Sequence, residues 1–99
     1  MARVVLAAAA DADLDRLLDF LAGEDPTAAL TVKDIIFDAL EILKRHPLIG
    51  RPAEDDMREL VISRGKSGYV ALYQYVEAED VVLVLAVRHQ REAGFGARG

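Results

Sequence analysis

The fold is decided by residues 58–89, RELVISRGKSGYVALYQYVEAEDVVLVLAVRH, where strand-like runs alternate with short turns. Residues 58–64 alternate in character, so that Leu60 and Ile62 point to one face of the chain. Residues 69–76 are rich in aromatic and β-branched side chains, which fit the pleated surface of a sheet. Both patterns predict strands.

A third strand is predicted where apolar residues follow one another without interruption. Residues 81–87, VVLVLAV, form such a run, which is expected of a central strand covered on both faces. The links between the three runs, at 65–68 and 77–80, are four residues each. Because short links join antiparallel neighbours, residues 58–89 predict a β-meander.

The N-terminal part of the chain predicts a short strand and then an amphipathic helix. The strand covers residues 3–7, which include β-branched side chains. One face of the helix carries Leu14, Leu17, Leu18 and Leu21. Asp11 or Asp13 is expected to cap its N-terminus, and Gly23 is expected to end it.

A second helix is predicted directly after the first. Asp25 is its expected N-cap and Pro26 its first residue, and it is expected to run to about Arg45. Its main apolar stripe consists of Val32, Ile36, Leu40 and Leu43. Two amphipathic helices with a short link predict an antiparallel helical hairpin. Residues 47–56, with two prolines and one glycine, predict a loop.

Together these elements predict one α+β domain that spans residues 1–99. The expected order is β-α-α-β-β-β: an N-terminal strand, then a helical hairpin packed on a mainly antiparallel β-sheet. Hydrophobic residues make up 53% of the chain, which is enough to build a core.

Composition argues against several classes of function. The net charge is −5, whereas a protein that binds nucleic acid directly needs a basic surface to displace counterions. No apolar run reaches the ~18–20 residues of a membrane span, and the apolar start fits a strand better than a signal peptide. With two histidines and no cysteines, no metal or other cofactor is expected, and a cytoplasmic location is predicted.

A polar cluster follows the last apolar run, at Arg88, His89, Gln90 and Arg91, with Phe95 close behind. From Arg88 onward there are three arginines and one glutamate, so this end of the chain is locally basic. Arginine and aromatic side chains are typical of protein-interface hot spots. In a simpler interpretation, Arg88 marks the point where the strand meets water and Phe95 folds back on the core.

Three stretches of the chain resemble the ParE/RelE superfamily of toxins from bacterial type II toxin–antitoxin pairs. They are HPLIGRP (46–52), the meander of residues 58–89, and RHQREAGF (88–95). Within the meander, the family's SGY…Y pattern is matched by Ser67, Gly68, Tyr69 and Tyr73. The resemblance implies the same fold and a hetero-oligomer with a ParD-like antitoxin. It also implies one of two activities, since RelE-like members cut messenger RNA in the ribosome and ParE-like members poison DNA gyrase.

The residues favour the ParE-like branch, which implies gyrase inhibition without catalysis. RelE-like members carry an Arg directly after the SGY tyrosine and usually a C-terminal Tyr, where this chain has Val70 and Phe95. The expected target-binding residues are Arg88, His89, Gln90, Arg91 and Phe95. The alternative is a metal-independent endoribonuclease that uses Arg64, Arg88, His89 and Glu92. A third interpretation is a non-toxic member that only binds its partner.

The expected antitoxin-binding residues come from two parts of the chain. Leu30 and Phe37 fall off the main stripe of the second helix. Tyr69, Tyr73 and Tyr75 share one face of their strand, a pattern that also fits a core under the helices. A partner helix in a groove and a partner strand on a sheet edge both remain open as binding modes.

Overall fold

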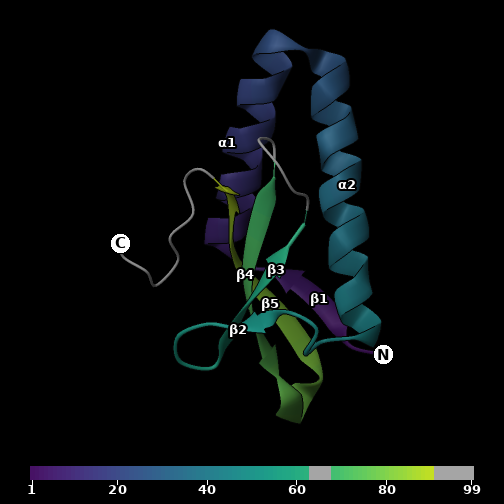
Figure 1. The fold of residues 1–99 in the computed structure, drawn as a ribbon. Helices are drawn as coiled ribbons and strands as arrows, with labels where there is room; N and C mark the ends of the chain where they lie inside the picture. The colour runs from purple at the N-terminus through teal and green to yellow at the C-terminus, as the bar shows by residue number, and fades with distance from the viewer. Residues whose placement is uncertain (63–67, 91–99) are drawn as a thin grey trace.

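The computed structural model describes residues 1–62 and 68–90, and its elements follow in the predicted order (Figure 1). The two helices are α1, Ala8–Glu24, and α2, Pro26–Arg45. The strands are β1 (Arg3–Leu6), β2 (Arg51–Pro52), β3 (Met57–Val61), β4 (Tyr69–Val76) and β5 (Val81–His89). A short 3₁₀ helix, η2 (Glu77–Glu79), connects β4 to β5. The predicted α+β class is therefore confirmed.

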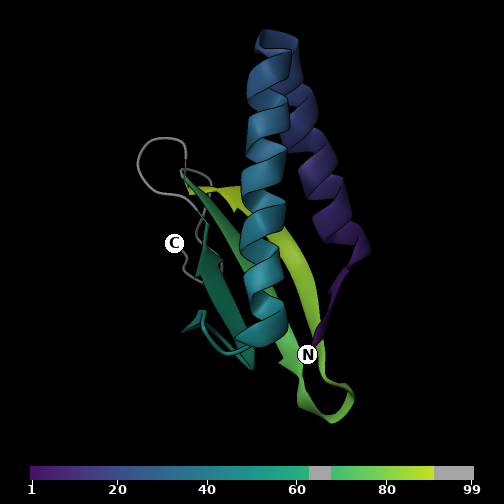
Figure 2. The ribbon, with the colours of Figure 1, turned by 90° about the vertical axis from the view of Figure 1, so that its right-hand side faces the viewer.

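The strands form one sheet in the order β1-β5-β4-β3-β2. β1 pairs in parallel with β5, and every other neighbouring pair is antiparallel, so the predicted mainly antiparallel sheet is confirmed. Both helices pack on one face of this sheet, and the hairpin extends beyond its end (Figure 2). None of the helices in the described part of the chain is both long and apolar enough to cross a bilayer.

β5 lies between β1 and β4, but the helices cover only one of its two faces. The pairing of β5 with β4 also contains an irregularity. Leu72 pairs with Ala86 and Tyr73 with Val84, so one extra residue of β5 lies between them. Such a bulge changes which alternate residues face the core. The core-facing residues of β5 shift accordingly from Val82 and Val84 to Val87.

The core forms where the helical stripes meet the sheet. α1 contributes Ala10 and Leu14, and α2 contributes Ile36, Leu40 and Leu43. From the sheet come Tyr69, Ala71, Tyr73, Val82, Val84 and Val87. The predicted stripe of α2 is thus confirmed, with Val32 partly buried at its edge.

The two helix starts differ from each other. At α2 the prediction is confirmed, because the side chain of Asp25 accepts hydrogen bonds from the backbone N–H groups of Thr27 and Ala28, at 3.1 and 3.3 Å. At α1 it is wrong, because the helix starts at Ala8 and its N-cap, Ala7, makes no side-chain cap. Asp11 and Asp13 consequently lie inside the helix.

Two smaller expectations also need correction. α1 does not stop at Gly23 but continues to Glu24, and Asp25 is both its C-cap and the N-cap of α2. The predicted loop of residues 47–56 contains β2, which pairs with β3 and is joined to it by an ion pair between Arg51 Nε and Glu59 Oε1 at 2.9 Å.

Candidate functional site

The candidate site lies at the end of β5, where that strand runs past its neighbour β1. β1 stops at Leu6, whereas β5 continues to His89. Beyond β1, the backbone N–H of Val87 donates to Oδ2 of Asp13 at 3.0 Å. A side chain from α1 therefore satisfies a strand-edge donor that would otherwise be buried without a partner. Asp13 itself is only 8% exposed.

The Asp13 carboxylate also lies close to two arginine side chains. Oδ1 of Asp13 accepts a hydrogen bond from Arg16 at 3.2 Å, and Oδ2 lies 3.9 Å from Nε of Arg88. The side chains of Arg16 and Arg88 are 55% and 42% exposed, so solvent screens these ion pairs in part and limits their contribution to stability. Their consequence is geometric, because Asp13 restrains Arg88 close to α1.

His89 is held by the neighbouring strand. It pairs with Tyr69 across β4 and β5, and the two rings meet edge to face with centroids 5.4 Å apart. The Tyr69 ring is buried, and this burial raises the pKa of its hydroxyl above the ordinary value of 10.0. One residue further, the backbone N–H of Gln90 donates to the carbonyl of Gly68 at 2.8 Å, which extends the β4–β5 contact to the end of the strand.

A pocket of about 330 Å³ opens beside His89, lined by Arg16, Leu17 and Phe20 of α1. Phe20 is largely exposed at its rim. The structure therefore brings the predicted Arg88 and His89 together with residues of α1 that were not predicted for the site, and Gln90 follows them at the end of β5. A sequence signal was available, since Phe20 is a large apolar residue that lies outside the leucine face of its helix.

The strand neighbours of Arg88 are apolar. Arg88 pairs with Val70, and Val70 pairs with Val61 on its other side. Directly paired residues project to the same face of a sheet, so this face carries one arginine beside two valines. Val70 is 2% exposed. The remaining predicted site residues, Arg64, Arg91, Glu92 and Phe95, lie outside the described residues.

The residues expected to bind the antitoxin separate into two groups. Tyr69 and Tyr73 are buried in this chain's own core, and the Tyr73 hydroxyl accepts a hydrogen bond from Gly50 N at 2.8 Å. Because both side chains are buried within this chain, they expose no surface to a partner. We therefore assign Tyr69 and Tyr73 to the core and not to the antitoxin-binding surface. Leu30 and Phe37 are exposed on α2, and Tyr75 is partly exposed.

A second pocket lies beside β1, between that strand and α2. Its volume is about 410 Å³, and it is lined by Val4, Leu6, Phe37 and Leu40 with the charged Glu41 and Lys44. Within residues 1–62 and 68–90, no group of three histidine or carboxylate side chains is arranged to hold a metal ion.

The family model for the ParE toxin of type II toxin-antitoxin system, parDE, matches residues 4–94. The chain belongs to this family. It is 37% identical to Toxin RelE3 of Caulobacter vibrioides over 93% of this chain and 98% of that protein. It is 34% identical to Toxin RelE1 of the same organism over 72% of this chain and 76% of that protein. The ParE/RelE membership expected from the sequence is therefore confirmed.

Solved structures agree on the fold of this ParE-family toxin. A chain of the chromosomal ParDE toxin–antitoxin system from P. aeruginosa superposes with a TM-score of 0.74 at 22% identity, covering 90% of this chain and 96% of that chain. A chain of the RelBE2 complex from Mycobacterium tuberculosis gives 0.58 at 24% identity, covering 89% and 96%. A chain of the E. coli RelBE complex gives 0.59 at 16% identity, covering 90% and 96%.

Proposed function

We propose that this toxin stops growth by binding DNA gyrase and that a ParD-like antitoxin neutralises it in a cytoplasmic hetero-oligomer. The target-binding surface is the end of β5, with Arg88, His89 and Gln90, continued by Arg91 and Phe95 in the chain. The pocket beside this surface is lined by Arg16, His89 and the exposed Phe20, and arginine and aromatic side chains around a small pocket are features of a protein-binding surface.

The observation that carries this proposal is the pairing of Arg88 with the buried Val70. Metal-free cleavage of RNA needs a base, an acid and several cations around the developing phosphorane. On the strand face beside Arg88, the successive neighbours across β4 and β3 are the apolar Val70 and Val61. Apolar strand neighbours beside Arg88 support docking more than phosphate chemistry.

A metal-independent, ribosome-dependent endoribonuclease is the second candidate. The relatives in Caulobacter vibrioides carry the names Toxin RelE3 and Toxin RelE1, and histidine is the most frequent general acid or base in catalysis. In this alternative, His89 acts with Arg64, Arg88 and Glu92. A third candidate is a member of the fold that binds its partner without being toxic.

The antitoxin surface that we propose uses the exposed apolar residues of α2. Leu30 and Phe37 lie seven residues apart and therefore on the same face of the helix. Phe37 also lines the pocket beside β1, and a partner segment bound in that pocket contacts Val4 and Leu6. Tyr75 pairs with Val82, and Val82 pairs with Val4, so Tyr75 lies on the same face of the sheet as that pocket, two strands away, and we propose it as a further contact.

Two assays on the purified, antitoxin-free protein separate these functions. One measures plasmid supercoiling by gyrase, and the other measures cleavage of messenger RNA in translating ribosomes. We expect gyrase inhibition with intact message, and we expect Arg88→Ala to weaken the inhibition by about tenfold, as for a hot-spot arginine. Arg45→Ala, at the exposed end of α2, is the matched control and should leave inhibition unchanged.

The histidines give the decisive comparison for the alternative. Message cleavage that is lost in His89→Ala but kept in His46→Ala, the exposed histidine after α2, would establish the ribonuclease and refute gyrase as the target. If neither gyrase nor message is affected while the antitoxin still binds, the non-toxic, partner-binding form is supported instead.

A further inference from the structure

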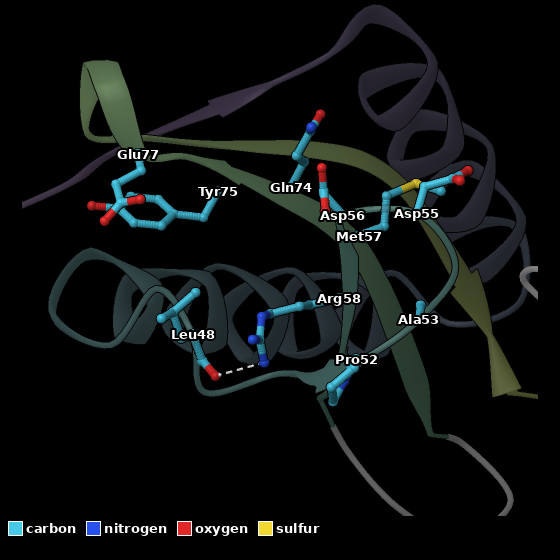
Figure 3. A pocket seen from close by; sticks show the side chains of 10 residues that line it. All are labelled: Leu48, Pro52, Ala53, Asp55, Asp56, Met57, Arg58, Gln74, Tyr75 and Glu77. Carbon is cyan, nitrogen blue, oxygen red and sulfur yellow. Dashed lines mark hydrogen bonds between the residues drawn. The ribbon is translucent and has the colours of Figure 1, made fainter.

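Figure 3 shows a different pocket, of about 410 Å³. It lies near the end of β4 at Gln74 and Tyr75, whereas Arg88 pairs with Val70 near the start of that strand. The walls of the pocket come from the loop before β2, the β2–β3 turn, β3, β4 and η2. Tyr75 and Met57 belong to its lining, and Tyr75 lies six residues along β4 from Tyr69. At ~3.3 Å per residue, the pocket is about 20 Å from the His89 end of the strand pair.

The loop that forms one wall of this pocket is held rigidly by hydrogen bonds. One nitrogen of Arg58 donates to the carbonyls of Leu48, at 3.1 Å, and Gly50, at 2.7 Å; Figure 3 shows the first of these bonds. The Gly50 N–H donates in turn to the hydroxyl of the buried Tyr73. The loop is thereby fixed to β3 and β4 before any partner arrives.

This fixed loop presents two large apolar side chains to solvent. Leu48 is 57% exposed and Ile49 is 56% exposed, and Leu48 lines the pocket. A preorganised apolar surface loses little conformational entropy on binding, which favours affinity. Adjacent exposed apolar residues on a rigid loop are therefore a feature of an interaction surface.

The charge around the pocket is negative. Asp55, Asp56 and Glu77 line it and are exposed. The Tyr75 hydroxyl donates to a fourth carboxylate, Asp80, at 2.7 Å. Of the described residues that line the pocket, Arg58 alone is cationic, and its guanidinium is already bonded to two backbone carbonyls. The net charge of the pocket lining is therefore negative, and it favours a cationic group of a partner.

We propose that this pocket is a docking site for a basic and apolar segment of a protein partner. A lysine or arginine of that segment is placed beside Asp55 and Asp56, while Glu77 adds negative charge at the other end of the pocket. A neighbouring apolar side chain packs on Leu48 and Met57. Lysine and arginine suit such a site because their apolar stems pack on hydrophobic walls while the charged head meets the carboxylates.

The chemistry of this pocket does not depend on which target the Arg88 end engages. Because the two surfaces lie near opposite ends of β4, a partner in the pocket leaves Arg88 and His89 accessible. A bound segment at this end therefore allows the toxin to engage a second macromolecule at the same time.

A titration followed by NMR tests the proposal on the full-length, ¹⁵N-labelled chain. The probe is an acetylated decapeptide in which lysine and leucine alternate, and the control peptide carries glutamate in place of lysine. We expect the lysine peptide to shift the backbone amides of Leu48, Met57 and Gln74 and the glutamate peptide to shift none of them. Shifts confined to α1, or none at all at millimolar peptide, would overturn the proposal.

Matched variants then separate this pocket from the general negative charge of the protein. Asp55→Asn with Asp56→Asn removes two charges at the pocket and should weaken binding by about fivefold, given the modest strength of exposed ion pairs. Asparagine tolerates the positive φ of 56° at Asp55. Asp15→Asn with Asp19→Asn removes two exposed charges on α1 and should have no effect.

The apolar half of the site has its own pair of variants. Leu48→Ser should weaken peptide binding, whereas Ile35→Ser, at an exposed isoleucine of α2, should not. Equal weakening by both charge pairs, or by both apolar variants, would show that the peptide binds the surface non-specifically and would refute the site.

Discussion

At the scale of single residues, Gly50 shows how a tertiary contact selects an amino acid. A Cβ at this position would lie 2.7 Å from the Tyr73 ring and hydroxyl and 2.8 Å from the carbonyl oxygen of Glu59. Tyr73 is fully buried and Glu59 O belongs to the sheet backbone, so neither neighbour can move aside cheaply. Glycine is required here for lack of space.

Replacing Gly50 with alanine should therefore destabilise the protein by about 2 kcal/mol, in the range of overpacked cores. Chemical denaturation followed by circular dichroism measures this change. Gly23→Ala is the control, because nothing lies within 4 Å of a Cβ built there, and alanine in a helix should stabilise by about 0.5–1 kcal/mol. Equal effects at the two positions would contradict the packing explanation.

At the scale of elements, one carboxylate joins α1 to β5. Asp13 accepts the Val87 N–H and lies between Arg16 and Arg88. It thus takes the place of a strand neighbour where β1 has ended, and it fixes the end of β5 that carries the candidate site. A helix residue in this way determines the position of a strand residue 74 positions later in the chain.

Asp13→Ala should destabilise the protein by about 2–3 kcal/mol, because the buried Val87 N–H loses its acceptor. Asp13→Asn keeps a side-chain oxygen and should cost about half as much. Asp15→Ala, on the exposed face of the same helix, is the control and should change little. Thermal denaturation of the three variants checks the order, and hydrogen exchange at Val87 should accelerate only in the two Asp13 variants.

At the scale of the whole molecule, the helical hairpin and the sheet share one core that includes two tyrosines. Burial raises the pKa of the Tyr69 hydroxyl above the ordinary 10.0. Burial also raises the pKa of Tyr73, and this outweighs the opposite effects of the Gly50 hydrogen bond and the Arg58 charge. The folded protein therefore prefers both hydroxyls protonated.

Global stability should consequently fall as the pH rises above about 10. Below this pH, tyrosine is protonated in both the folded and unfolded states; above it, only the unfolded chain ionises freely, so unfolding gains free energy. Tyr69→Phe removes one such group and should make the decline shallower. Urea unfolding between pH 7 and 11.5 measures the free energy of unfolding of both proteins. Parallel declines above pH 10 would contradict the contribution assigned to Tyr69.

The sequence by itself determined the order of the elements, the helical hairpin, the meander and the ParE/RelE family. These follow from local periodicity, from the Asp25-Pro26 helix start and from the short turns, all of which act over a few residues. The polar cluster at Arg88, His89 and Gln90 was also visible, because it directly follows an apolar strand.

Only the tertiary structure decided what surrounds that cluster. Asp13 resembles a helix cap in the sequence, yet α1 starts earlier and its carboxylate binds the edge of β5. Tyr69 and Tyr73 fit either a core or an interface by pattern, and the helices that cover them settle the choice. The bulge in β5 and the pocket beside Leu48 depend on pairing between distant segments, which local sequence patterns do not encode.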